Sequence, residues 1–211
     1  MATVDRILAE SRVRLEGIPW HLYQTIAESR GDRPLPRLTY HHGVLELMSP
    51  SFRHEALTSR VRIFVFMLAR GPGRPCLDAG STRWEREDVS SGKEPDACFY
   101  LENEPRVRGL RDIDLTIHPP PDLAVEVEIS HPLSDALRVY EALRVPEVWR
   151  YDGDSLTFLH LGNDGTYIEE STSRSFPMLH SLEALEVLAK AEELSQTVWS
   201  NEVEEWAKRT L

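Results

Sequence analysis

Apolar residues recur along the chain at two different spacings, which separate helical from extended segments. A spacing of three and four residues predicts helices at residues 3–16, 19–28, 52–69 and 134–143. Between residues 182 and 206, the same spacing predicts one or two amphipathic helices with an acidic outer face. Runs rich in β-branched and aromatic residues predict strands at residues 76–82, 96–101, 123–129 and 148–151.

Two further segments have the pattern of β-hairpins. Residues 37–48 turn at His42-Gly43, and residues 156–169 turn across a Gly-Asn-Asp-Gly sequence. The stretch at residues 106–121 contains three consecutive prolines and reads as a loop-rich connection. With no repeat, low-complexity tract or clear linker, the order of elements predicts one mixed α/β domain over residues 1–211, with N-terminal helices before residue 35 and a helical tail from residue 181.

The composition is that of a folded globular protein. Hydrophobic residues make up 41% of the chain and charged residues 28%. No stretch approaches the roughly 18 to 20 apolar residues of a membrane span, and the first residues lack the apolar core of a secretory signal. Two cysteines are too few for a disulfide scaffold. We therefore expect a cytoplasmic protein without membrane contact.

The net charge of -11 argues weakly against a nucleic-acid partner. The acidic excess, however, lies almost entirely in residues 101–211, and residues 1–100 are close to neutral. The first half of the chain is therefore free to present a local basic surface.

Three acidic residues form the strongest candidate site. Asp96 opens one predicted strand, and Glu126 and Glu128 lie on one face of the next, since side chains alternate along a strand. The strand is otherwise so apolar that both faces should be buried, where two carboxylates are costly unless they are neutralised. A divalent cation would neutralise them. The alternative is an edge strand with a solvated glutamate face.

Two residues earlier in the chain are weaker candidates. His54 lies one turn into a predicted helix, on its inward face, where it could position a water, contact phosphate or transfer a proton. A structural histidine bonded to the backbone is the alternative. Glu46 in the preceding strand reads as a solvated hairpin residue or as a further carboxylate of the site.

Four sequence blocks resemble the Uma-type family of putative restriction endonucleases, a large bacterial group. The blocks are Y-x-x-G-V-L-E-L-M-S-P-S-x-x-H at residues 40–54, E-P-D-A-C-F-Y at 94–100, P-P-D-L-A-V-E-V at 120–127 and V-P-E-V-W-R-Y-D-G at 145–153. Their order and approximate spacing match the family over residues 35–155. Four linked blocks are far more specific than one.

This resemblance implies a PD-(D/E)xK nuclease fold, with a central mixed sheet flanked by helices, and DNA as the substrate. Asp96 matches the motif aspartate and Glu126 the motif acidic residue, which would hold Mg²⁺ or Mn²⁺ to activate a water. His54 and Glu46 match positions that the family commonly keeps near the same site.

The chain departs from the family pattern at the signature lysine. Glu128 occupies the motif position, and Ala136 occupies the helical position where many relatives carry a lysine instead. Lys93 and Arg138 are candidate substitutes, although neither falls on the expected position. A missing cation would impair stabilisation of negative charge in the transition state.

Three functions follow from these observations. The first is a magnesium-dependent endonuclease acting on DNA, in which a homodimer would allow both strands to be cut. The acidic C-terminal helix with Trp199 and Trp206 is one candidate dimer surface, unless it packs back on the domain. The second is a degenerate nuclease fold that binds nucleic acid or protein without cutting. The third, an unrelated acidic interaction module, would leave Glu126 and Glu128 solvated and far from Asp96.

Overall fold

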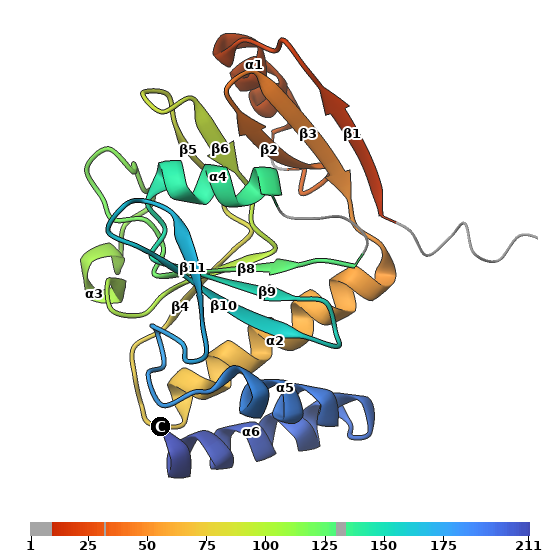
Figure 1. The fold of residues 1–211 in the computed structure, drawn as a ribbon, viewed down its shortest axis with the longest axis vertical. Coiled ribbons are helices and arrows are strands. Elements are labelled where there is room, and N and C mark those ends of the chain that lie inside the picture. Colours follow the sequence, from red (N-terminus) through yellow and green to blue (C-terminus); the bar gives the residue numbers. More distant parts are fainter. Residues whose placement is uncertain (1–9, 32, 130–133) are drawn as a thin grey trace, which may run out of the picture.

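The computed structural model describes residues 10–31, 33–129 and 134–211 (Figure 1). Its elements in chain order are β1 (Ser11–Leu15), α1 (Trp20–Arg30), β2 (Arg37–His41), β3 (Val44–Ser49), α2 (Phe52–Arg70), β4 (Leu77–Gly80), β5 (Trp84–Arg86), β6 (Ser91–Lys93), β7 (Ala97–Tyr100), α3 (Glu104–Val107), β8 (Leu123–Val127), α4 (Ser134–Leu143), β9 (Glu147–Tyr151), β10 (Leu156–Leu161), β11 (Tyr167–Glu170), α5 (Ser181–Ala189), the short 3-10 helix η2 (Lys190–Glu192) and α6 (Gln196–Thr210).

The described strands form two sheets, which confirms the mixed α/β class. Sheet A has the order β1-β3-β2-β6-β5, and every neighbouring pair in it is antiparallel. Sheet B has the order β11-β10-β9-β8-β7-β4 and is mixed, because β8 and β9 run parallel. The sequence predicted only one central sheet. Strands β5 and β6 have three residues each, too few to show an alternating pattern.

Sheet A has one apolar and one polar face. On the apolar face, Leu38 and Tyr40 of β2 and Leu45 of β3 pack with Tyr23 and Ala27 of α1. Since side chains alternate along a strand, the intervening residues of the hairpin point to the opposite face. That face is turned toward sheet B and α4 (Figure 1).

Helices cover both faces of sheet B. On one face, α2 packs with α5 and α6 over a core that includes Phe64, Val125 and Trp149. On the other face, α4 contributes Val139 and Tyr140 to a second core. Helix α4 also approaches sheet A, with Cα atoms within 8 Å of those of β2 and β6. Helix α4 therefore joins the two sheets (Figure 1).

One helix prediction is wrong. Residues 3–16 were expected to be helical, but Ser11–Leu15 is a strand that pairs antiparallel with β3. Pairing satisfies the backbone groups at the open edge of the hairpin, and this tertiary gain outweighs the local pattern. Residues 3–9 of that predicted helix lie outside the described residues. Short helix α3, in the expected loop, was also not predicted.

The C-terminal helix packs back on the body of the protein. Trp199, Val203 and Ala207 are fully or almost fully buried, and α6 lies along α2. The approach is close at Gly71, where an added Cβ would lie 2.7 Å from the Cβ of Ala207. These side chains of α6 are therefore core residues and are not available as a dimer surface. In the part of the chain that the structure describes, no helix is long and apolar enough to cross a membrane.

Candidate active site

Asp96 lies directly before β7, the strand that pairs with β8, and is only 3% exposed. Its Oδ1 accepts a hydrogen bond from Nη1 of Arg37. Its Oδ2 lies 3.1 Å from Nε2 of His54 and accepts a hydrogen bond of 2.7 Å from the backbone N–H of Val127. Burial alone would raise the pKa of Asp96, but the hydrogen bond and positive charge of His54, together with Arg37, hold it below its usual value.

Glu126 lies in β8, beside Asp96, and is 4% exposed. Its Oε1 accepts a hydrogen bond from the hydroxyl of Tyr140, and its Oε2 lies 3.2 Å from Nζ of Lys93. Burial raises the pKa of Glu126 above its usual value; Lys93 opposes this shift and the negative charge of Asp96 adds to it. The charge of Asp96 therefore affects the pKa of Glu126. The burial of Glu126 contradicts the hypothesis of an unrelated acidic interaction module, which requires a solvated Glu126.

Lys93 brings a cation to Glu126 from sheet A. It ends β6, is 6% exposed, and its Nζ also lies 3.3 Å from the hydroxyl oxygen of Thr39. The same ammonium lies 5.8 Å from the ring centroid of Tyr140. Of the two substitutes that the sequence suggested for the motif lysine, Lys93 contacts the acidic residue Glu126 directly.

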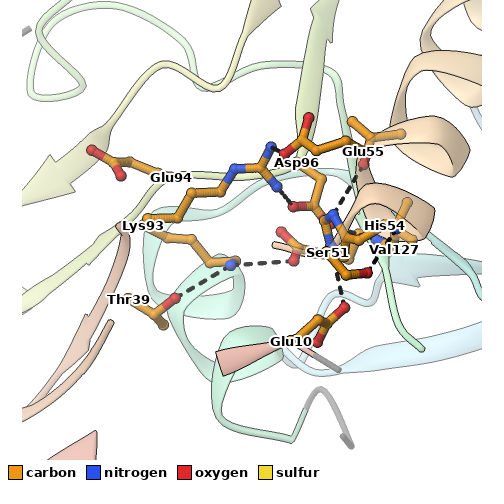
Figure 2. A network of polar contacts seen from close by, with 12 residues as sticks. Glu10, Thr39, Ser51, His54, Glu55, Lys93, Glu94, Asp96 and Val127 are labelled. Atoms are coloured by element: carbon orange, nitrogen blue, oxygen red, sulfur yellow. Dashed lines mark hydrogen bonds and ion pairs between the residues drawn. The ribbon is translucent and has the colours of Figure 1, made fainter. Parts of the chain in front are cut away.

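His54 is fully buried in the first turn of α2. The hydroxyl of Ser51 caps this helix by accepting a hydrogen bond from the backbone N–H of His54. The Nε2 atom of His54 faces Asp96 on one side and lies 3.7 Å from Oε1 of Glu10 on the other (Figure 2). Burial lowers the pKa of His54, but the hydrogen bond and charge of Asp96 and the charge of Glu10 raise it above its usual value.

The other two candidate carboxylates pair with arginines. Glu46 of β3 accepts a hydrogen bond of 2.7 Å from Arg12, across the β1–β3 pair. Glu128 lies beyond the end of β8, with Oε2 4.0 Å from Nε of Arg150. The contacts therefore group Asp96, Glu126 and His54. Glu46 lines a cavity together with Glu126, and Glu128 does not line it.

Two residues of the site were not predicted from the sequence. Glu10 lies in the stretch that was expected to be helical, so its approach to His54 depends on the strand pairing of β1. Arg37 opens β2 and bridges Asp96 to Glu55 of α2, with 2.8 Å between Nη2 and the glutamate oxygen. A basic residue at the start of a hairpin carries no local signal for such a role.

A cavity of about 300 Å³, here called the site cavity, lies between the polar face of sheet A and α4. Its walls carry five Lys and Arg side chains against three carboxylates, so its local charge is positive although the whole chain is acidic. Its lining residues are Arg12, Arg14, Arg37, Thr39, His41, His42, Val44, Glu46, Met48, Lys93, Glu94, Glu126, Ala136 and Arg138.

The carboxylate pair fits one kind of metal site. Within the described ranges, no three His, Cys, Asp or Glu side chains group in a way that could hold a metal ion. Mg²⁺ is usually held through one or two carboxylates, with waters and substrate phosphates as its other ligands. Asp96 and Glu126 are two carboxylates of the kind such a site uses, and their partners in the protein include Arg37, His54 and Lys93.

Comparisons with known proteins agree with this picture of the fold. A family model described as "Putative restriction endonuclease" (Uma2) matches residues 20–195. The fold also matches a crystal structure of a putative nuclease belonging to DUF820 from Anabaena variabilis ATCC 29413, with a TM-score of 0.55 and 15% sequence identity. That match covers 82% of this chain and 99% of the other. No curated protein matches the sequence.

Proposed function

Because the chain belongs to the Uma2 family of putative restriction endonucleases, we propose that it is a metal-dependent nuclease that hydrolyses phosphodiester bonds in DNA. One observation carries the proposal. Asp96 and Glu126 are both buried, the backbone N–H of Val127, next to Glu126, donates a hydrogen bond to Asp96, and Glu126 lines a cavity whose other charges are mostly positive. This arrangement suits an anionic substrate that is cut at a metal ion.

The proposed metal is Mg²⁺ or Mn²⁺, which the carboxylates of Asp96 and Glu126 would hold. When bound, such an ion lowers the pKa of a water and polarises the phosphate. In the hydrolysis itself, the water oxygen bonds to phosphorus, one P–O ester bond breaks, and the leaving oxygen takes a proton. The family resemblance at residues 94–100 and 120–127 supports both ligands.

Lys93 is the proposed cation for the reacting phosphate. Negative charge grows on the phosphate oxygens in the transition state, and a fixed cation in a site shielded from water stabilises it strongly. The ammonium of Lys93 lines the site cavity and is held by Glu126 and Thr39. It therefore offers the charge that the sequence lacks at positions 128 and 136.

His54 and Arg37 are proposed as positioning residues. Each holds one oxygen of Asp96, and neither side chain needs to touch the substrate to do so. Together with the backbone N–H of Val127 they fix the direction of the carboxylate. The positive charge of Arg37 also offsets the cost of burying Asp96.

A second candidate function is a nuclease fold that binds nucleic acid or protein without cutting. The observation that favours it is that both carboxylate oxygens of Asp96 already have partners within the protein. Metal binding would then require Arg37 or His54 to release an oxygen.

The proposal includes a cytoplasmic location. Cys76 and Cys98 are free thiols, which is the state that a reducing cytoplasm maintains. A homodimer stays a prediction.

The test is a cleavage assay on labelled DNA over a series of Mg²⁺ and Mn²⁺ concentrations, with a chelator as the blank. The proposal predicts products that appear with the metal and disappear with the chelator. Binding of DNA without any products, at every metal concentration, would replace the nuclease with the non-cutting alternative.

A further inference from the structure

The polar face of sheet A forms a charged wall that leads to Glu126. Arg14 of β1, Thr39 and His41 of β2, and Glu46 of β3 alternate with residues that face away from the cavity, and all four line it. The apolar face of the same hairpin is covered by α1. The polar face is therefore fixed toward the site.

Helix α4 forms the opposite wall and is held firmly in place. Val139 and Tyr140 are fully buried against sheet B, while Ala136 and Arg138, which lie nearer the start of the helix, line the site cavity. The Cα atoms of α4 come within 8 Å of those of β2 and β6. The described part of α4 therefore stands close to β2 and β6 and limits the width of the space between the two walls.

The reacting groups lie on the inner wall of this narrow space. Glu126 and Lys93 line the cavity, yet they are only 4% and 6% exposed, so a phosphodiester has to enter it to reach them. The volume of about 300 Å³ is at the lower end of the range for pockets that hold one small ligand. A B-form double helix is much larger, since its major groove alone is about 12 Å wide.

We infer that the substrate reaches Glu126 as an unpaired single strand of DNA, held between the polar face of sheet A and α4. The inference rests on the proposed nuclease function and names its substrate class. Arg14 and Arg138 supply charge for the sugar-phosphate backbone, and Val44 and Met48 supply apolar surface for a base. Because a single strand is cut at one site in one chain, this substrate does not require a two-fold dimer.

The test presents one labelled DNA sequence as a single strand, as a blunt duplex and as a duplex with an unpaired overhang, each with Mg²⁺. We expect the single strand and the overhang to be cut at least about tenfold faster than the blunt duplex, with the cuts confined to unpaired nucleotides. A blunt duplex that is cut as fast as the single strand would overturn the inference. An RNA strand of the same sequence shows whether the site cavity distinguishes ribose from deoxyribose. RNA that is cut faster than DNA would overturn the assignment of DNA as the substrate.

A binding measurement without metal separates this inference from the nuclease proposal. We expect the single strand to bind more tightly than the duplex in fluorescence anisotropy, and Ala136→Trp, which fills the cavity, to weaken that binding at least about tenfold. Glu28→Trp on the exposed side of α1 is the matched control, and the melting temperature of both variants checks their folding. If wild type cuts nothing but shows this binding pattern, only the nuclease proposal fails. If Ala136→Trp is folded and binds the single strand like wild type, the strand does not enter the cavity and the inference fails.

Discussion

The ammonium of Lys93 lies 3.2 Å from Oε2 of Glu126, although the two residues belong to different sheets. Lys93 ends β6 in sheet A, and Glu126 lies in β8 of sheet B. The candidate site is therefore formed where the two sheets meet, and sheet A contributes chemistry as well as a wall. The lysine absent from positions 128 and 136 has a counterpart that reaches the same carboxylate from another strand.

Lys93→Met should slow DNA cleavage by about 100- to 1000-fold, because it removes the fixed cation and keeps the apolar length of the side chain. DNA binding in Ca²⁺ should change little, since the lost interaction forms in the transition state. The measurement is the single-turnover cleavage rate beside the dissociation constant. Lys190→Met in η2, away from the site cavity, is the control.

A lysine introduced at position 136 provides the complementary test. Ala136 lines the same cavity as Lys93, so the double variant Lys93→Met/Ala136→Lys should recover part of the lost rate. A folded Lys93→Met variant with the wild-type rate would contradict the proposed role. A low rate that falls together with the melting temperature, and that Ala136→Lys does not restore, would show a structural role instead.

The hairpin of β2 and β3 and the helices α2 and α4 could be predicted from the sequence because their patterns are local. The turn at His42-Gly43 is an example, since both residues have positive φ values, 45° and 87°, as the short turn requires. Strand β1 could not be predicted, because its extended form depends on pairing with β3, which is distant in the sequence. Strands β5 and β6 were too short to show any period.

The candidate site was predictable to a similar degree. Asp96 and Glu126 are predictable because each is an acidic residue next to a strongly apolar run, and the structure places Asp96 directly before β7 and Glu126 in the neighbouring strand β8. Arg37 and Glu10 could not be found, because their roles depend on how sheet A meets α2. Glu128 was placed on the right strand, but the strand ends before it.

His54→Ala should lower the free energy of unfolding by about 1 to 3 kcal/mol, because it leaves a buried oxygen of Asp96 without one of its partners. Urea denaturation at neutral pH measures the change. His21→Ala, at an exposed position of α1, is the control and should be close to neutral. An equal effect in both variants would show that the Asp96 contact contributes nothing to stability.

Glu147 should make stability depend on pH. Its buried carboxylate accepts hydrogen bonds from Trp149 and from the backbone N–H groups of Arg174 and Ser175. Burial would raise the pKa of Glu147, but hydrogen bonds from His160, Ser175 and Trp149 hold it below its usual value. A lowered pKa means that this stabilisation is present above the unfolded pKa of about 4.3 and is lost as the pH falls through that region.

The measurement for this group is urea denaturation of wild type and Glu147→Gln at a series of pH values between neutral and acidic. Wild type should be the more stable at neutral pH. The difference in free energy of unfolding between the two proteins should decrease as the pH falls below about 4. A difference in free energy of unfolding that stays constant over the pH series would show that Glu147 does not change its protonation on unfolding.

Gly71→Ala should destabilise the packing of α2 on α6 by about 1 to 3 kcal/mol, since the new Cβ would lie 2.7 Å from that of Ala207. The double variant Gly71→Ala/Ala207→Gly should recover only part of the lost stability, because it removes the opposing Cβ, while the backbone O of Glu204 and the backbone N of Lys208 remain 3.0 Å from the new carbon. The comparison of all four proteins by thermal unfolding measures the coupling. Additive losses in the double variant would contradict the contact.

Arg138→Ala should weaken binding of single-stranded DNA and reduce its dependence on salt. If Arg138 contacts one phosphate, the slope of log affinity against log salt should fall in magnitude by about 0.7. Arg111→Ala, an exposed arginine outside the cavity lining, should leave the slope unchanged. Equal slopes of log affinity against log salt for both variants would show that Arg138 does not contact the DNA backbone.

The central claim is that Asp96 and Glu126 form the centre of a metal-dependent nuclease. Its most direct test compares DNA cleavage in Mg²⁺ by wild type, Asp96→Ala, Glu126→Gln and the surface control Asp88→Ala, all purified in the same way. The account predicts that wild type and Asp88→Ala cut, and that the two site variants are at least about 100-fold slower. Cutting by folded Asp96→Ala and Glu126→Gln at the wild-type rate would contradict it.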